Sequence, residues 1–312
     1  MMNIAKDVTE LIGHTPLLKI NQLLPADTDS EVVAKVESFN PASSVKDRVA
    51  LAMLNAAEAS GKLKPGGTIV ESTSGNTGVA LAMVGAARGY KVVITMPESM
   101  SKERRALMRA FGAELVLTPA AKGMQGTVDA AQKVVAEREG AILASQFTNP
   151  ANPQTHYENT AEEIWADANG QVDVFVAGIG TGGTVTGVGR RLKELNPDIE
   201  VFGIEPEESA LLTTGKAGAH GIQGIGANFV PDILDSKVLT KVLTVKTEDA
   251  IAMARKAAAK EGLLVGISAG SALVGALRLA QSPDMKGKRI VTLLPDTGER
   301  YLTTPLFKDL MD

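Results

Sequence analysis

The sequence contains no cysteine, and its 312 residues include only three histidines and one tryptophan. The absence of cysteine excludes disulfide bonds, thiolate nucleophiles and thiolate metal sites. The histidines, His14, His156 and His220, show no metal-ligand spacing, so we expect no metal centre and interpret them as surface or hydrogen-bonded structural residues. Catalysis must therefore depend on lysine, hydroxyl or amide groups, or on a cofactor.

The chain also lacks a strong net charge and a long apolar run. Its 32 basic and 36 acidic residues give a net charge of -4, which creates no broad field for nucleic acid or an anionic membrane. The longest apolar run, residues 79–87, is far shorter than the roughly 20 residues of a membrane-spanning helix. The first ten residues lack the basic and apolar segments of a signal peptide. We therefore expect a cytoplasmic protein that binds neither nucleic acid nor membrane and holds any anionic ligand locally.

Short β-rich runs alternate with longer helical patterns along most of the chain. This alternation predicts an α/β fold with parallel-rich sheets flanked by helices. The expected strands are residues 32–36, 68–71, 92–96, 115–117, 174–177, 201–204, 242–245 and 290–294. The expected helices include residues 48–59, 77–88, 102–111, 128–138, 184–195 and 249–261. A proline-bearing break at residues 149–153 predicts a boundary between two lobes. Ligands of such sheets bind at the carboxyl ends of strands, so the loops after strands are the candidate sites.

The segment Asn40–Arg48 places a lysine at the start of a predicted helix. Ser44 and Asp47 have the S-x-x-D form of a helix start, with Ser44 as the N-cap, which puts Lys46 in the first turn. The helix dipole disfavours an ammonium there, so the position suits a neutral amine that forms an imine with a carbonyl. For a lysine taken alone, a solvated residue paired with Asp47 is the favoured interpretation.

Two further loops combine glycines with hydroxyls between a strand and a helix. Ser72–Gly78 gathers hydroxyls, an amide and backbone N–H groups that suit a carboxylate, a phosphate or a ring oxygen, although the same residue types also cap helices. Gly178–Thr184 lets the backbone approach a phosphate. Its glycines also fit G-x-G-x-x-G, with Glu205 placed as a ribose-binding acid, so a dinucleotide site stays open as an alternative. The fourth loop, Gly266–Ser271, is by itself only a small-residue turn.

Together these four loops resemble the O-acetylserine sulfhydrylase (cysteine synthase) family of fold-type-II pyridoxal-phosphate enzymes. The resemblance runs from Leu11–Leu17 to Pro295–Tyr301. It implies a two-lobed, tryptophan synthase β-like fold with twisted sheets. Residues 40–150 would be the smaller, mobile lobe with the substrate-binding loop, and residues 1–39 plus 151–312 the larger lobe with the phosphate cup.

The resemblance also implies roles for individual residues. Lys46 is the catalytic lysine, which binds the aldehyde of pyridoxal 5'-phosphate. The remaining cofactor contacts are Asn76, the phosphate cup Gly180, Thr181, Gly182, Gly183 and Thr184, and Ser268 against the pyridine nitrogen. The contacts to the substrate carboxylate are Thr73, Ser74, Asn76, Thr77 and Gln146.

The activity implied by the resemblance is β-replacement, which makes L-cysteine and acetate from O-acetyl-L-serine and sulfide. The family resemblance further implies a homodimer, and the C-terminal tail of serine acetyltransferase as a partner. The alternative is a cystathionine β-synthase-like lyase that joins serine or O-acetylserine to a larger thiol. A nicotinamide dehydrogenase would leave Lys46 and the loop around Asn76 unexplained. Two positions depart from the family pattern, namely His14 and Asn228, which stands where glycine is frequent.

Overall fold

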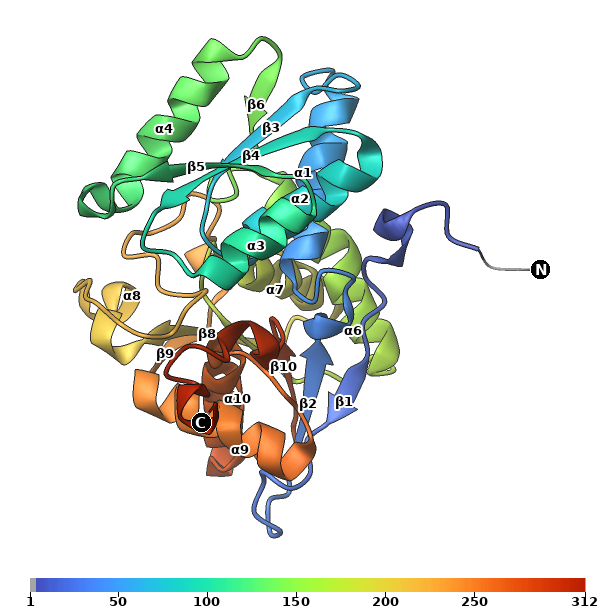
Figure 1. Cartoon of the computed structure of the whole chain (residues 1–312). Coiled ribbons are helices and arrows are strands. Elements are labelled where there is room, and N and C mark those ends of the chain that lie inside the picture. The colour runs from blue at the N-terminus through green and yellow to red at the C-terminus, as the bar shows by residue number, and fades with distance from the viewer. Residues whose placement is uncertain (1–3, 312) are drawn as a thin grey trace. The chain divides into compact units, whose positions relative to one another are not determined.

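The chain forms two compact units, each built on its own sheet (Figure 1). The structure is a computed structural model that describes residues 4–311. The first unit takes the described residues up to Ile12 together with Asn40–Asn152. The second takes Gly13–Phe39 and the chain from Pro153 onward. The break after Asn152 falls inside the proline-bearing segment in which the sequence predicts a boundary.

The observed division differs from the expected one at the N-terminus. Residues 4–12 belong with the first unit, whereas the sequence assigns all of residues 1–39 to the larger lobe. The cause is apolar packing: the 3-10 helix η1 (Val8–Leu11) contacts helix α2 (Asn76–Arg88), and Val8 and Ile12 pack against the buried core of the first unit. Two isolated apolar side chains carry no such signal in the sequence.

The sheet of the first unit has four parallel strands in the order β5-β4-β3-β6. Each strand is followed by a connection that runs over a face of the sheet, as parallel pairing requires. The strands are β3 (Thr68–Ser72), β4 (Lys91–Pro97), β5 (Glu114–Thr118) and β6 (Ala141–Leu143). The helices are α1 (Lys46–Ala59), α2 (Asn76–Arg88), α3 (Lys102–Ala110) and α4 (Gly123–Glu137).

Helices cover both faces of this sheet, because its strands are apolar on both sides. Successive side chains of a strand point to opposite faces. Ile69 and Ile94 therefore pack with residues of α1 and α2, whereas Val70 and Val93 pack with α4 on the other face. This burial on both faces explains why the strands read as continuous apolar runs.

The second unit contains a six-stranded sheet in the order β1-β2-β10-β7-β8-β9. Only β1 is antiparallel to its neighbour. The strands are β1 (Leu17–Lys19), β2 (Glu31–Val36), β7 (Val174–Gly178), β8 (Glu200–Pro206), β9 (Lys241–Val245) and β10 (Arg289–Leu294). The helices are α5 (Ala151–Thr155), which spans the division between the units, α6 (Ala161–Asp167), α7 (Gly183–Leu195), α8 (Leu211–Thr214), α9 (Thr247–Glu261) and α10 (Ile267–Ala280).

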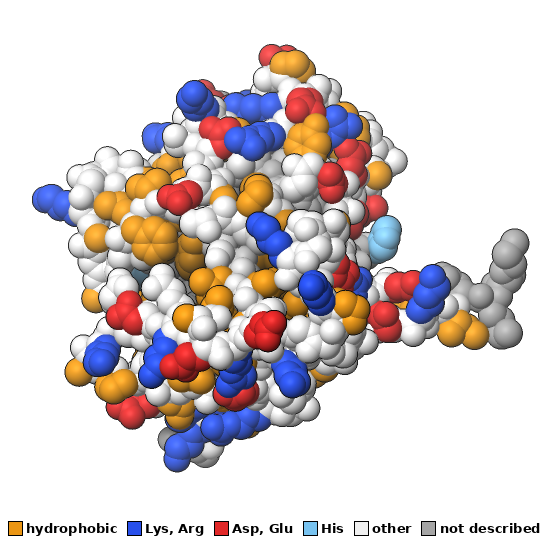
Figure 2. Space-filling view, turned by 90° about the horizontal axis from the view of Figure 1, so that it is seen from above, with side chains coloured by type: hydrophobic (Ala, Val, Ile, Leu, Met, Phe, Trp, Pro, Cys, Tyr) orange, Lys and Arg blue, Asp and Glu red, His pale blue; other side chains and the backbone are white. Residues whose placement is uncertain are grey.

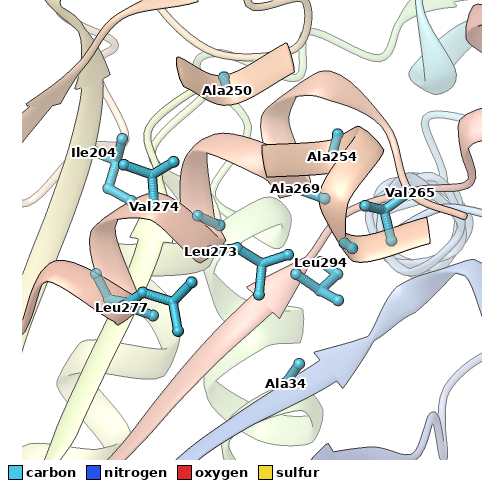
Figure 3. Packing of buried hydrophobic residues seen from close by; sticks show 14 of the residues in the cluster. Ala34, Ile204, Ala250, Ala254, Val265, Ala269, Leu273, Val274, Leu277 and Leu294 are labelled. Carbon is cyan, nitrogen blue, oxygen red and sulfur yellow. The ribbon is translucent and has the colours of Figure 1, made fainter. Parts of the chain in front are cut away.

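Helix α10 forms the centre of the core in this unit. Nearly all of its residues are buried, because the sheet lies on one side and α9 on the other. Leu273 and Val274 belong to one buried cluster with Leu294 of β10 and Ile204 of β8 (Figure 3). Burying a Leu or Val side chain of this kind contributes about 1.5–3 kcal/mol to the free energy of unfolding.

The eight expected strands and six expected helices are all present, with ends that differ by a few residues. Strands β1 and β6 were missed because each has only three residues, too few to show a period. The helical segment from α5 to α6 was missed because Pro153 reads as a break, although proline is compatible with the first turn of a helix. Helix α4 begins five residues before the expected start, at a glycine.

The surface carries both signs of charge. On the face shown in Figure 2, Lys and Arg side chains alternate with Asp and Glu side chains, in keeping with the small net charge. Within residues 4–311, no helix has both the length and the hydropathy needed to cross a membrane.

Close packing in the second unit predicts the effect of one added methyl group. A Cβ at Gly187 of α7 would lie 2.1 Å from the carbonyl oxygen of Pro153 and 2.7 Å from Cβ of His156. We expect Gly187→Ala to lower the free energy of unfolding by about 1–3 kcal/mol, since backbone must move. The matched control is Gly189→Ala, because its Cβ would meet only side-chain methyl groups at 3.2 Å. Thermal unfolding of both variants is the measurement, and equal melting temperatures would contradict the packing argument.

Candidate functional site

Three of the loops singled out in the sequence lead directly into helices α2, α7 and α10. The residue at the N-cap of each of these helices is a glycine, namely Gly75, Gly182 and Gly266, and none of the three makes a side-chain cap hydrogen bond. The preference for Ser, Thr and Asn as helix caps therefore does not explain the polar residues of these loops. An N-terminus of this kind presents backbone N–H groups and the positive end of the helix dipole to an anion.

In the first unit, Lys46 is the first residue of α1 and is partly buried. The Ser44 hydroxyl accepts a hydrogen bond from the backbone N–H of Lys46 at 3.2 Å and donates one to the Asp47 carboxylate at 3.3 Å. That carboxylate also accepts from the backbone N–H of Ala42 at 2.6 Å. Ser44 and Asp47 thus interact at the helix start as the S-x-x-D pattern predicts, although Val45 occupies the N-cap position.

The loop from Thr73 to Thr77 is organised by hydrogen bonds within the first unit. The Thr73 hydroxyl accepts from the backbone N–H of Gly75 at 3.2 Å, and Thr73 and Thr77 are buried. The Thr77 hydroxyl donates to Oε1 of Gln146 at 2.7 Å. The structure therefore brings Gln146, which lies 69 residues further along the chain, against this loop.

Ser74 and Asn76 of the same loop are partly buried. Arg104 of α3 donates a hydrogen bond to the carbonyl oxygen of Ser74 at 3.3 Å. This contact ties the loop to α3, which follows the neighbouring strand β4. Four of the five predicted carboxylate contacts thus belong to one loop, and Gln146 adjoins it through Thr77.

Glu71, near the end of β3, is a residue that the sequence reasoning missed. Its side chain is buried, and its carboxylate accepts from the backbone N–H of Ser145 at 2.7 Å and from Nε2 of Gln146 at 3.4 Å. Burial raises the pKa of Glu71 to about 7, although the hydrogen bonds from Ser145 and Gln146 act to lower it. The sequence did offer a signal for Glu71, because a carboxylate near the end of an apolar strand, two residues before Thr73, is unusual.

In the second unit, the glycine-rich loop after β7 forms a tight turn into α7. Gly182 has φ of 82°, a conformation that favours glycine, and the Thr181 hydroxyl accepts from the backbone N–H of Gly183 at 3.3 Å. The Thr184 hydroxyl lies 3.3 Å from Nε2 of His156, whose Nδ1 lies 2.9 Å from the Thr160 hydroxyl. His156 is therefore a buried structural histidine that supports this loop.

The structure places the glycine-rich loop, the segment Gly224–Gly226 and Ser268 together. A Cβ at Gly180 would lie 2.4 Å from the carbonyl oxygen of Gly224. The backbone N–H of Gly226 donates a hydrogen bond to the carbonyl oxygen of Ile179 at 3.0 Å. A Cβ at Gly224 would lie 3.7 Å from Oγ of Ser268. Ser268 is buried in the first turn of α10, so the loop Gly266–Ser271 lies close to the glycine-rich loop Gly178–Thr184.

Both departures from the family pattern adopt left-handed backbone. His14 has φ of 48° and Asn228 has φ of 64°. Asparagine tolerates this region better than most residues, which explains how it stands where glycine is frequent. Oδ1 of Asn228 accepts a hydrogen bond from the Ser209 hydroxyl at 2.6 Å, so the side chain is fixed on its own segment.

The dinucleotide interpretation requires Glu205 to bind a ribose. Instead, the buried Glu205 carboxylate accepts hydrogen bonds from the backbone N–H groups of Leu212 and Thr213, at 2.8 and 2.9 Å, and from the Thr213 hydroxyl at 2.6 Å. These contacts hold the short helix α8 against β8. Glu205 is therefore a structural residue, and the G-x-G-x-x-G spacing lacks the acid that a dinucleotide site needs.

Comparison with known proteins supports the interpretation of the chain as a pyridoxal-phosphate enzyme. The sequence pattern of the family described as pyridoxal-phosphate dependent enzyme matches residues 8–296. The chain belongs to this family. It is 49% identical to cysteine synthase A of Escherichia coli, over 99% of this chain and 98% of that protein, and 48% identical to a cysteine synthase of Staphylococcus aureus, over 96% of each.

Solved structures agree with the family assignment. Cysteine synthase from Entamoeba histolytica matches with a TM-score of 0.95 and 45% identity, over 98% of this chain and 91% of that chain. An O-acetylserine dependent cystathionine β-synthase from Helicobacter pylori matches with a TM-score of 0.91 and 38% identity, over 98% and 100%. This pyridoxal-phosphate dependent enzyme therefore has the fold-type-II architecture expected from its motifs.

Pyridoxal phosphate is the cofactor of this family, and the glycine-rich loop suits its phosphate group. The N-cap of α7, a helix of 13 residues, is a glycine without a side-chain hydrogen bond, and among the first N–H groups that of Gly183 donates to Thr181, so the helix dipole and the other N–H groups of the first turn suit an anion. The loop residues Thr181, Gly182 and Gly183 are buried and carry no charged side chain that would repel a dianion. Ser268, next to Gly224, adds a hydroxyl that can meet a ring nitrogen.

The buried carboxyl of Glu71 predicts a pH dependence of stability. Its folded pKa, about 7, lies above the ordinary value of 4.5, so between these values the folded chain holds a proton that the unfolded chain releases. The free energy of unfolding should therefore fall as pH rises from about 4.5 to 7, by up to about 3 kcal/mol. Glu71→Gln removes this titration. Urea unfolding of both proteins at pH 5 and 8 measures the effect, and parallel pH profiles would contradict it.

Proposed function

We propose that this enzyme makes L-cysteine and acetate from O-acetyl-L-serine and sulfide by β-replacement. The observation that carries the proposal is similarity to cysteine synthases over nearly the whole chain, 49% identity over 99% of it. Lys46, the Thr73–Thr77 loop, the Gly180–Thr184 loop and Ser268 each lie at the start of a helix or in the turn before it.

In this proposal Lys46 has two tasks. Bound pyridoxal phosphate supplies an aldehyde that bonds to an amine and a ring that accepts electron density from the α-carbon of the substrate. Nζ of Lys46 would hold the cofactor through its aldehyde and, when free, would remove the α-proton of the substrate. Acetate leaves from the β-carbon, hydrosulfide adds to the same carbon, and the Lys46 ammonium would return the proton to the α-carbon. The first turn of α1 suits this lysine, because the helix dipole there favours the neutral amine.

The substrate carboxylate is assigned to the loop before and within the first turn of α2. Thr73, Ser74, Asn76 and Thr77 bind it together with Gln146, and Asn76 also contacts the cofactor ring. The hydrogen bond between Thr77 and Gln146 supports this assignment, since it joins two of the proposed contacts. Backbone N–H groups at the start of α2 add positive potential for an anion.

The cofactor phosphate is assigned to Gly180, Thr181, Gly182, Gly183 and Thr184. The pyridine nitrogen is assigned to the Ser268 hydroxyl. A neutral hydroxyl does not hold that nitrogen protonated as a carboxylate would, which favours prompt loss of acetate over transamination. The position of Ser268 supports the assignment, because its hydroxyl lies beside Gly224, which packs against the glycine-rich loop.

Four further features belong to the same proposal. The enzyme is a cytoplasmic homodimer, the first unit is a lobe that moves when substrate binds, and the second unit carries the phosphate cup. The C-terminal tail of serine acetyltransferase is a partner. Size-exclusion chromatography with light scattering tests the dimer, and calorimetric titration with a peptide of that tail tests the partner.

A second candidate function is the joining of O-acetylserine to a larger thiol. The similarity to an O-acetylserine dependent cystathionine β-synthase, 38% identical with a TM-score of 0.91, favours including it. We expect sulfide to give the larger kcat/KM when sulfide and homocysteine are compared as acceptors with the same enzyme. Preference for homocysteine would replace the proposed activity with the second candidate.

Lys46→Ala tests the central assignment. We expect loss of cysteine formation by at least about 10³-fold, since both the covalent link and the proton transfer depend on one amine. The independent readout is mass spectrometry after borohydride reduction, which should find the cofactor mass on the Lys46 peptide of the natural enzyme. Lys62→Ala, on the same unit, is the control and should keep both properties. Cofactor mass on another lysine would contradict the assignment.

A further inference from the structure

The hydrogen bonds of Gln146 determine which end of its side-chain amide faces which neighbour. Oε1 accepts from the Thr77 hydroxyl at 2.7 Å, and Nε2 donates toward Glu71 at 3.4 Å. An ionised carboxylate only accepts hydrogen bonds, so it selects the amide nitrogen rather than the amide oxygen. The second N–H of Nε2 can then donate to another anion.

The Glu71 carboxylate also holds the backbone that carries Gln146. It accepts from the backbone N–H of Ser145 at 2.7 Å, and Ser145 has φ of 57°, a left-handed conformation unusual for serine. Nδ2 of Asn152 donates to the carbonyl oxygen of Gln146 at 2.9 Å, which fixes the other side of the same peptide segment. Glu71 thus fixes both the backbone and the side chain of Gln146.

We propose that Glu71 is a positioning residue, which fixes the Gln146 amide so that its nitrogen faces an α-carboxylate bound at the Thr73–Thr77 loop. The inference rests on the proposed function, in which Gln146 and this loop bind the carboxylate of the substrate. Glu71 itself does not touch the substrate and acts through Gln146. A flipped amide would turn its oxygen toward the carboxylate and repel it.

The charge of Glu71 depends on few neighbours. Strands β4 and β6 and helices α2 and α4 pack against β3. The charged residues of these elements are Lys91, Arg88, Asp129, Lys133 and Glu137, and none of them contributes to the pKa shift. Burial raises the pKa to about 7, and the N–H donors of Ser145 and Gln146 lower it. Below this pH the carboxyl gains an O–H donor that faces N–H donors, so its selection of the amide nitrogen weakens.

The first test compares Glu71→Gln with the natural holoenzyme at pH 8. We expect kcat/KM for O-acetylserine to fall about tenfold, the effect of losing one charge-assisted hydrogen bond, while kcat at saturation changes less than about twofold. The affinity for L-serine, which carries the carboxylate without the acetyl group, should fall by the same factor. Unchanged kcat/KM and unchanged L-serine affinity would overturn the inference.

A double-mutant cycle separates positioning from a structural role. If Glu71 acts through Gln146, adding Glu71→Gln to Gln146→Ala should lower kcat/KM by less than about twofold more. The matched control is Thr95→Val on the neighbouring strand, which removes a buried hydrogen bond to the Thr127 carbonyl without touching Gln146. It should lower the melting temperature and leave kcat/KM unchanged. Multiplicative effects in the cycle, or a tenfold loss in the control, would overturn the inference.

A third measurement needs no Glu71 variant and guards against misfolding. The ratio of kcat/KM between the natural enzyme and Gln146→Ala should shrink as pH falls from 8 to 6, because Glu71 becomes protonated and Gln146 loses its orientation. Using the ratio cancels titrations that both proteins share. A constant ratio would overturn the inference. Absence of cysteine formation by the natural holoenzyme would instead overturn the proposed function, while L-serine affinity would still score the positioning by Glu71.

Discussion

The proposed ligand contacts of this chain depend on how its helices begin. Helices α2, α7 and α10 each follow a glycine that serves as the N-cap without a side-chain hydrogen bond, and α2 and α7 come directly after parallel strands. A side-chain cap would satisfy the backbone N–H groups at the helix start and would remove the anion-binding capacity of that terminus. The phosphate of pyridoxal phosphate and the carboxylate of an amino-acid substrate are both anionic groups, so helix N-termini of this kind suit both.

The proposed cofactor site in the second unit also requires two loops whose backbones approach each other closely. Gly180 and Gly224 are so near that a Cβ on the former would lie 2.4 Å from the carbonyl oxygen of the latter. Glycine at 180 therefore serves the packing of two loops against each other, as well as the turn itself. The same packing brings Gly224 beside Ser268, so the loop after β7 and the start of α10 are parts of one arrangement.

The first unit buries polar side chains that have hydrogen-bond partners but no charged partner. Glu71, Gln146 and Thr77 form one chain of hydrogen bonds, in which each oxygen faces a donor. Buried networks of this type specify one arrangement, because a flipped Gln146 amide would leave its oxygen facing the Glu71 carboxylate, two acceptors without a donor. Burial raises the pKa of Glu71 in spite of these hydrogen bonds, so desolvation of the carboxylate outweighs what the network returns to it.

The sequence by itself determined the fold class, most strands and helices, and the loops that match the pyridoxal-phosphate dependent enzymes. These properties depend on local periodicity and on short motifs, such as Asn40–Arg48 and Gly178–Thr184, that neighbouring residues define together. It also left Glu205 open as a ribose-binding acid, because spacing alone cannot tell a ligand from a helix cap.

Tertiary structure alone decided the remaining points. It assigned Glu205 to helix α8, joined residues 4–12 to the first unit, and placed Glu71 and Gln146 in contact although 75 residues separate them. Each of these depends on contacts between segments that are distant in the chain and on the exclusion of water around them. Periodicity and motif spacing contain no information of that kind, because they describe only residues that are neighbours in sequence.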